Sequence, residues 1–308
     1  MIRPVKFHLG LPTDHVDMGD EFVSVEAISA IANAAEAAGF ESVLVTEHPF
    51  PPDEWMSTGG HHALDPFVAL SFAAAATSRI KLLTYLCVLP YRNPFLAAKA
   101  ALTLDVLSRG RLLLGVGAGY LEAEFRAVGV DFDERNELLD ESIDAMRRAW
   151  TQDSVVITGR HFDAQGHTMM PRPAQPGGPP IWVGGNSRRA LRRAAELGNG
   201  WLPMFNPRAM GARRHSAHLE NLDDLRSMLA YLHECRDAAG ATGPFDVVAL
   251  PMVPTSPDSP DFDRARVDDH FAELESLGVT GLTIFMPSTS RAAYLDGITS
   301  FADEYAPA

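Results

Sequence analysis

Apolar residues along the chain form eight short runs that alternate with longer stretches in which they recur at helical spacing. Short apolar runs bounded by Gly, Pro or Asp are typical of buried strands, and spacings of three and four residues indicate helices. The expected strands cover residues 5–11, 42–46, 80–89, 111–116, 181–183, 200–205, 246–253 and 279–286. The expected helices cover residues 25–38, 65–77, 93–108, 122–128, 135–151, 188 onward, 221–239, 262–277 and 291–305. This alternation predicts an α/β protein with a (β/α)8 TIM barrel, since a doubly wound open sheet would not need eight regular units.

Residues 154–180 interrupt the alternation. They read as a small hairpin followed by a segment rich in Pro and Gly, which indicates an insertion before the fifth strand rather than a barrel element. The chain shows no internal repeat and no linker that would divide it. We therefore expect a single domain over residues 1–308 with this insertion.

The stretch PPIWVGGNSRRALR, residues 180–193, combines a short strand, a glycine pair and a helix start. The glycines allow positive φ and close approach of a ligand, and Asn186 or Ser187 suits the N-cap. The free N–H groups and the dipole at a helix N-terminus favour a phosphate, and Arg188 and Arg189 add positive charge. The same pattern also fits an ordinary turn between a strand and a helix.

Composition and charge narrow the function. The formal net charge of −14 argues against a nucleic-acid surface and against binding to anionic lipid. Two cysteines, Cys87 and Cys235, suit a reducing compartment. The N-terminal residues run directly into a strand pattern, and no apolar run approaches the length of a membrane span, so we expect a cytoplasmic protein.

In a barrel of this kind the active site lies where the strands end, so the residues at those positions matter most. They are apolar and rich in glycine, and the titratable groups among them are Glu47 and His48. Such a site is poor for metal-assisted hydrolysis and suits a flat, largely apolar cofactor. His48 can act as general acid or base or bond a cofactor carbonyl, or it can be a structural residue. The adjacent His61 and His62 favour a loop over a metal site, so no metal is expected.

Four motifs in order resemble the luciferase-like monooxygenase superfamily, and more closely its branch of coenzyme F420-dependent oxidoreductases. They are TEHPF at 46–50, LPYRNP at 89–94, LSRGRLLLGVGAGYLEAEF at 107–125 and PIWVGGNS at 180–187. The resemblance extends from the first strand to about Leu202. It implies a TIM barrel with a deazaflavin or flavin lying across the strand ends.

The resemblance also assigns roles by position. Glu47 and His48 correspond to residues that contact the deazaflavin ring, with His48 as proton donor. Tyr120 stands beside the substrate, where related sugar-phosphate dehydrogenases have a catalytic glutamate, and this departure argues against a sugar-phosphate substrate. The resemblance places a non-prolyl cis peptide at the end of the third strand, at Leu86, Cys87 and Val88. It places the substrate face beside Ala118 and Gly119. It places the phosphate-binding loop at Gly184, Gly185, Asn186, Ser187 and Arg188.

These observations predict an oxidoreductase that transfers a hydride between F420 and a small organic substrate, with His48 or Tyr120 handling the proton. An FMN-dependent two-component monooxygenase, supplied by a separate reductase, stays open because both cofactors carry a phosphate at the same position. A non-redox phosphate-binding lyase or isomerase would need carboxylates or a lysine at several strand ends, and Lys6, Lys81 and Lys99 lie elsewhere. We expect a homodimer, as is common in the superfamily.

Overall fold

The computed structural model describes residues 5–208, 217–256 and 261–305. Within these residues eight parallel strands close into a barrel whose order is β1-β10-β9-β8-β7-β4-β3-β2. The predicted (β/α)8 barrel is therefore confirmed. The barrel strands are β1 (Lys6–Gly10), β2 (Ser42–Val45), β3 (Lys81–Val88), β4 (Leu112–Gly117), β7 (Ile181–Gly184), β8 (Gly200–Leu202), β9 (Asp246–Ala249) and β10 (Gly281–Ile284).

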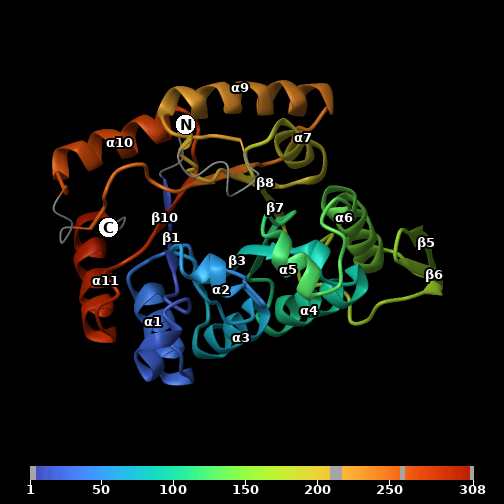
Figure 1. The fold of residues 1–308 in the computed structure, drawn as a ribbon, viewed down its shortest axis with the longest axis horizontal. Coiled ribbons are helices and arrows are strands. Elements are labelled where there is room, and N and C mark those ends of the chain that lie inside the picture. Colours follow the sequence, from blue (N-terminus) through green and yellow to red (C-terminus); the bar gives the residue numbers. More distant parts are fainter. Residues whose placement is uncertain (1–4, 209–216, 257–260, 306–308) are drawn as a thin grey trace.

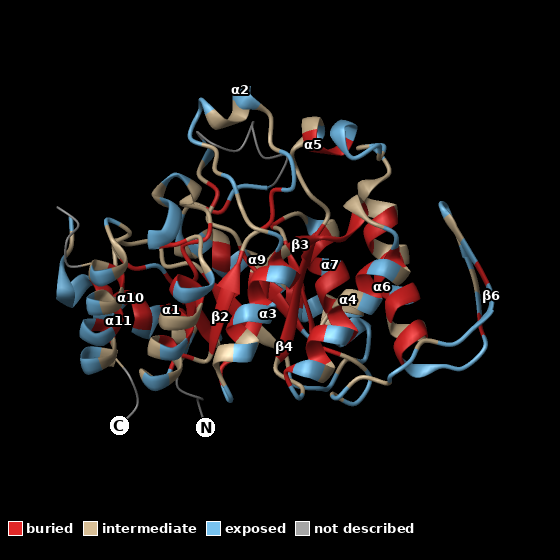
Figure 2. Ribbon diagram, turned by 90° about the horizontal axis from the view of Figure 1, so that it is seen from below, coloured by how far each residue is buried: buried red, intermediate tan, exposed pale blue. Residues whose placement is uncertain are grey.

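Helices surround the barrel (Figure 1). The longer ones are α1 (Val25–Ala37), α3 (Pro66–Ala76), α4 (Pro94–Leu107), α6 (Arg135–Thr151), α7 (Arg188–Leu197), α9 (Leu222–Ala238), α10 (Arg264–Ser276) and α11 (Arg291–Tyr305). A short helix follows each of the first four strands: η1 (Val16–Glu21), α2 (Asp53–Met56), η2 (Leu89–Tyr91) and α5 (Glu122–Ala127). Figure 2 shows α2 and α5 above one end of the barrel. None of the helices in the described ranges is both long and apolar enough to cross a membrane.

The helix starts follow from side-chain caps that the sequence signals. Asp65 and Asn93 accept hydrogen bonds from the backbone N–H of Val68 (3.0 Å) and Phe95 (2.9 Å), and each is followed by a proline in the first helical turn. Proline fits there because its missing N–H would have no partner inside the helix. Both predicted helix starts are thus confirmed.

The insertion lies at the edge of the molecule, away from the barrel (Figure 1). It begins with an antiparallel hairpin of β5 (Val155–Gly159) and β6 (Phe162–His167), as the sequence predicts. The segment that returns to the barrel is fixed by Asp105, a fully buried residue of α4. Its carboxylate accepts hydrogen bonds from the backbone N–H of Ala174 (2.8 Å) and from Gln175 Nε2 (2.8 Å).

Two apolar clusters hold the fold. A small one fills the barrel interior, and a large one lies between the sheet and the helices, where Figure 2 shows the buried residues. Three expected strands are shorter than the apolar runs that predict them: residues 200–205, 246–253 and 279–286 narrow to β8, β9 and β10. The apolar side chains of Met204 and Phe285, beyond these strands, line a cavity at the barrel end instead of continuing the sheet.

Glu36 of α1 ties that helix to the start of β3. Its carboxylate accepts hydrogen bonds from the backbone N–H groups of Ser78 (3.0 Å), Arg79 (2.5 Å) and Ile80 (2.8 Å). Burial acts to raise the pKa of Glu36, but these hydrogen bonds outweigh it and lower the pKa to about 2 from 4.5. Because the folded-state pKa is depressed, the stabilisation is present above pH 4.5 and is lost as the pH falls through about 2.

We therefore expect Glu36→Gln to destabilise the protein at pH 6, and we expect this destabilisation to disappear in acid. The difference in free energy of unfolding between wild type and variant should shrink from about pH 4.5 downward and vanish near pH 2. Urea unfolding followed by circular dichroism across this pH range measures it. Glu26→Gln, in the first turn of the same helix, is the control and should show a much smaller difference. A gap for Glu36→Gln that stays constant with pH would contradict the assignment.

Candidate active site at the carboxyl end of the barrel

A cavity of about 370 Å³ opens where the barrel strands end. The ends of β2, β3, β4, β7 and β8, with α5, the start of α6 and α7, form its wall. Eleven of the residues expected from the sequence line it: Glu47, His48, Leu86, Val88, Ala118, Gly119, Tyr120, Gly184, Gly185, Asn186 and Ser187. Cys87 and Arg188 are not among the lining residues.

His48 is held in place by a carboxylate that the sequence reasoning missed. His48 Nδ1 lies 3.1 Å from Oε2 of Glu124, a fully buried residue of α5. A carboxylate offers only acceptors, so Nδ1 donates the hydrogen bond and Nε2 is the ring atom left for chemistry. Nε2 lies 3.5 Å from the Tyr120 hydroxyl. The two expected catalytic residues are thus brought together.

Glu124 has two further hydrogen-bond donors. It accepts from the Tyr91 hydroxyl at 3.0 Å and from the backbone N–H of Phe50 at 3.2 Å. Burial, followed by the charge of Glu124, raises the pKa of Tyr91 above its usual value, so Tyr91 stays protonated and donates. These contacts fix the carboxylate and, through it, the orientation of the His48 ring.

Aromatic rings from the loop after β2 cover His48. The ring centroids of Trp55 and His61 lie 4.5 Å and 4.8 Å from that of His48, and Trp55 and His61 also contact each other. His61 therefore belongs to an aromatic wall of the cavity. No group of His, Cys, Asp and Glu side chains in the described residues is arranged to hold a metal ion.

Glu47 has a different surrounding from that of His48. Its buried carboxylate pairs with the Arg92 guanidinium and accepts a hydrogen bond from the backbone N–H of Val88 at 2.6 Å. Arg92 Nη1 also donates to the Cys87 sulfur at 2.7 Å, and burial followed by the nearby Glu47 charge raises the pKa of the Cys87 thiol. Cys87 is therefore a packed, protonated thiol beneath the cavity surface. Glu47 ties the ends of β2 and β3 together while it lines the cavity.

The third strand end contains a cis peptide between Tyr85 and Leu86, at the first residue of the stretch that the sequence indicated. The Leu86 side chain then fills the space above two glycines. A Cβ on Gly117 would lie 2.4 Å from Leu86 Cδ1, and one on Gly184 would lie 2.1 Å from Leu86 Cδ2. Gly117 and Gly184 therefore leave room for this leucine, and both glycines still line the cavity.

The β7–α7 turn agrees with the sequence prediction in most details. Gly185 has φ of +109°, and Ser187 is the N-cap, accepting from the N–H of Ala190 at 3.1 Å. Asn186 has a structural role, since its side chain bonds the backbone N–H and carbonyl of Met204. The turn thus presents the first N–H groups of α7, which have no acceptor within the helix, to the cavity.

The arginines that line the cavity near α7 are not Arg188 and Arg189, which the sequence suggested. Arg188 is exposed, and its guanidinium lies 4.7 Å from the centre of the Tyr231 ring. Arg193, one turn further along α7, lines the cavity, as does Arg135 at the start of α6. Arg193 is 4% exposed and pairs with Asp140. A signal for Arg193 exists in the sequence, because it falls on the apolar face of α7 beside Ala190 and Ala194.

The cavity therefore has one end at the N-terminus of α7, an apolar middle and a polar end at His48. A helix N-terminus with nearby arginines suits a phosphate. The apolar and glycine-rich middle suits a flat ring, and the other end supplies a hydrogen-bonded imidazole. These donors and surfaces fit a flavin or deazaflavin with its phosphate at α7.

Comparison with known proteins agrees with this geometry. The model of the luciferase-like monooxygenase family matches residues 5–261. The chain belongs to the luciferase-like monooxygenase family. An uncharacterised protein of Mycobacterium tuberculosis is 30% identical over 292 residues, which cover 88% of this chain and 92% of that protein. The family expected from the sequence motifs is thus confirmed.

Two further proteins are similar to this chain over different lengths. An F420-dependent glucose-6-phosphate dehydrogenase of Segniliparus rotundus is 35% identical over 174 residues, 55% of this chain and 50% of that protein. The crystal structure of monooxygenase RslO1 from Streptomyces bottropensis superimposes with a TM-score of 0.79, covering 97% of this chain and 98% of that chain. At 23% identity the second comparison supports the fold alone.

Proposed function

We propose that this luciferase-like protein is an oxidoreductase that transfers a hydride between F420 and a small organic substrate. The observation that carries the proposal is the pairing of His48 with the buried Glu124 at one end of a cavity whose other end is the N-terminus of α7. The F420-dependent glucose-6-phosphate dehydrogenase adds support, because it is 35% identical to this chain over about half of each protein.

In this proposal the chain positions the cofactor at two ends. The N–H groups at the start of α7, the Ser187 hydroxyl and Arg193 would hold the phosphate. Val88, Ala118 and Gly119 would contact the ring system, and Glu47 would keep the ends of β2 and β3 in register beneath it. When bound, the deazaflavin supplies a carbon that accepts or releases a hydride. The protein contributes orientation and electrostatics.

His48 would manage the proton. Glu124 holds the Nδ1 proton, so Nε2 can take or give a proton at the substrate oxygen. The Tyr120 hydroxyl, 3.5 Å from Nε2, would orient the same oxygen. The wall formed by Trp55 and His61 would exclude water from this end. Because Tyr120 replaces the glutamate of the sugar-phosphate enzymes, we propose a substrate without a sugar phosphate.

The FMN-dependent monooxygenase remains the second candidate. It is favoured by the likeness in fold to a solved monooxygenase and by an anion site that accepts either cofactor's phosphate. In that case a separate reductase would supply reduced flavin.

Fluorescence titration of the purified protein with F420 and with FMN tests the proposal. We expect F420 to bind at least about tenfold more tightly than FMN, a difference of about 1.4 kcal/mol. The reverse preference would support the monooxygenase. Binding of neither cofactor would overturn both candidates.

Two variants of Ser187 make this test specific to the anion site. Ser187→Asp keeps a good N-cap but places a carboxylate where the phosphate would lie, so it should weaken cofactor binding by about tenfold or more without loss of stability. Ser187→Asn keeps the cap without the charge and should bind nearly as well as wild type. Equal binding by the two variants would show that the phosphate does not lie at α7.

We also propose that two copies of the chain pair through α3. This helix contains no charged residue, and its outward positions Val68, Ser71, Phe72 and Ala75 leave Val68 60% and Phe72 42% exposed. A helix that is apolar all round is normally covered. In a chain with a net charge of −14, an uncharged face is where two copies can meet without strong repulsion.

Analytical ultracentrifugation tests the dimer. Wild type is expected to sediment as a dimer, and Phe72→Arg as a monomer, because the arginine would be buried without a partner. Val156→Arg changes an exposed apolar residue in the hairpin, away from α3, and should leave the dimer intact. A monomeric wild type, or a dimeric Phe72→Arg, would contradict the assignment of this face.

A further inference from the structure

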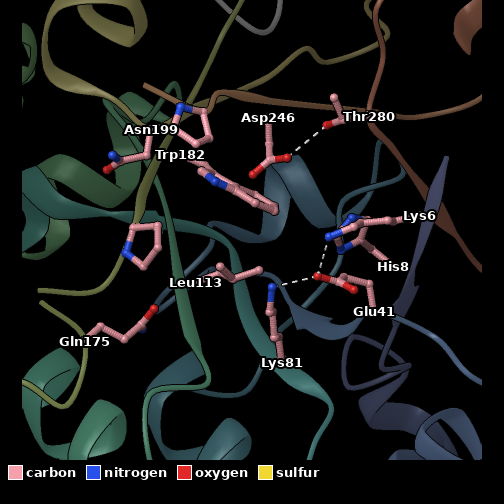
Figure 3. Close-up of a pocket in the computed structure, with 12 residues that line it drawn as sticks. Lys6, His8, Glu41, Lys81, Leu113, Gln175, Trp182, Asn199, Asp246 and Thr280 are labelled. Atoms are coloured by element: carbon pink, nitrogen blue, oxygen red, sulfur yellow. Dashed lines mark hydrogen bonds and ion pairs between the residues drawn. The ribbon is translucent and has the colours of Figure 1, made fainter. Parts of the chain in front are cut away.

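A second cavity lies at the opposite end of the barrel, where the strands begin. It has a volume of about 260 Å³ (Figure 3). Residues at or next to the start of all eight barrel strands line it. It is separate from the candidate active site, because the two cavities share no lining residue.

The rim of this cavity carries opposite charges on opposite sides. Lys6 and Lys81 both donate to Oε1 of Glu41, at 2.9 Å and 2.7 Å (Figure 3). Burial acts to raise the pKa of Glu41, but the hydrogen bonds from Lys81 and Lys6 outweigh it and lower the pKa. Two cations around one carboxylate leave this side with a net positive charge.

Asp246 carries the negative charge of the other side. It begins β9, which lies four strands from β3, the strand of Lys81, in the ring of eight. The two residues therefore stand across the mouth from each other. One oxygen of Asp246 accepts from the Thr280 hydroxyl at 3.2 Å. Burial lowers the pKa of His8 to about 3, so this histidine is neutral and adds no charge between them.

Two aromatic rings lie in the wall of this cavity. His8 and Trp182 meet edge to face, with ring centroids 5.7 Å apart. Trp182 is 3% exposed, and among the described residues its indole N–H has no hydrogen-bond partner. The indole nitrogen lies on the Asp246 side, because a Cβ on Gly200 would be 2.9 Å from it and 2.8 Å from the Asp246 carbonyl oxygen. A buried donor left unpaired is unfavourable, so a ligand that accepts from it is favoured.

We propose that this mouth of the barrel is a binding site for a small zwitterion of the α-amino acid type. The ammonium group of such a molecule pairs with Asp246. One carboxylate oxygen accepts from the Trp182 N–H beside it, and the other faces Lys6 and Lys81. In an α-amino acid the ammonium and carboxylate groups are adjacent, and Trp182 and Asp246 stand on either side of Gly200 in the strand register. The site is independent of the cofactor proposal.

Isothermal titration calorimetry with glycine and L-alanine tests this site. We expect both to bind with a dissociation constant of about 1 mM or below. Acetate and methylammonium each offer one of the two charges and should bind at least about tenfold more weakly. Absence of binding by either amino acid, or equal binding by acetate or methylammonium, would overturn the proposal.

Variants separate this site from general charge effects. Trp182→Phe removes the unpaired N–H and Asp246→Asn removes the negative pole, and each should weaken amino-acid binding by about tenfold. If Asp246→Asn does not fold, Lys81→Gln tests the positive pole in the same way. Asp237→Asn makes the same change of charge on α9 and should bind like wild type. The site would be refuted if Trp182→Phe and one of the two charge variants, Asp246→Asn or Lys81→Gln, each bound the amino acids as tightly as wild type.

Discussion

Changing His48 to alanine is expected to lower turnover with F420 by about 10²–10⁴-fold, the usual contribution of a positioned general acid or base. The loss should appear in kcat, because the variant still has the anion site at α7 and the apolar walls that would bind the cofactor. Absorbance of the cofactor measures turnover with a substrate that wild type uses. Fluorescence titration measures cofactor binding, which should change by only a few fold.

Tyr91→Phe provides the matched control for this prediction. It removes one donor to Glu124 but leaves the carboxylate and His48 in place, so the loss of kcat should be much smaller than in His48→Ala. Full turnover by His48→Ala would show that the histidine is not the proton donor. A large loss of cofactor binding in His48→Ala would instead assign it a binding role.

Gly115→Ala is expected to cause the largest loss of stability among single small substitutions in the barrel. Gly115 lies in β4, and a Cβ there would be 2.1 Å from the carbonyl oxygen of Thr84 on β3. That oxygen is part of the backbone, so relief requires the paired strands to move apart. The Thr84 hydroxyl also donates to the Gly115 carbonyl at 2.7 Å, which opposes such a shift. We expect a loss of about 3 kcal/mol in the free energy of unfolding.

Gly243→Ala is the control, since a Cβ at Gly243 meets nothing within 4 Å. Its effect should stay within about 0.5 kcal/mol. Urea unfolding of both variants and wild type measures the difference. Similar midpoints for Gly115→Ala and wild type would mean that the two strands separate more easily than their hydrogen bonds suggest.

The fold could be predicted from the sequence because its signals are local. Strand and helix periods, the proline-containing helix starts and the hairpin in the insertion each depend on a few neighbouring residues. Glu47 and His48 could be identified because they directly follow a strand, and barrel strands deliver their last residues to one end. Local order along the chain was therefore enough to predict that these two residues lie at the end of the barrel where the cavity opens.

The contacts that hold the residues of the candidate site in place could not be predicted in the same way. Glu124 lies on a short helix beyond the strand end and meets His48 across 76 positions of sequence. Only the packing of α5 against the loop after β2 brings them together. Leu86 likewise covers Gly117 and Gly184 from another strand, a contact that no pattern within either strand indicates.

The hydrogen bond from Phe50 to Glu124 has a consequence for how this site can diversify. The loop after β2 is attached to the Glu124 carboxylate through a main-chain N–H, and the Phe50 side chain is 72% exposed. Every amino acid except proline supplies that N–H. The side chain at position 50 can therefore vary freely, and with it the entrance that a substrate meets, while the orientation of His48 is inherited unchanged.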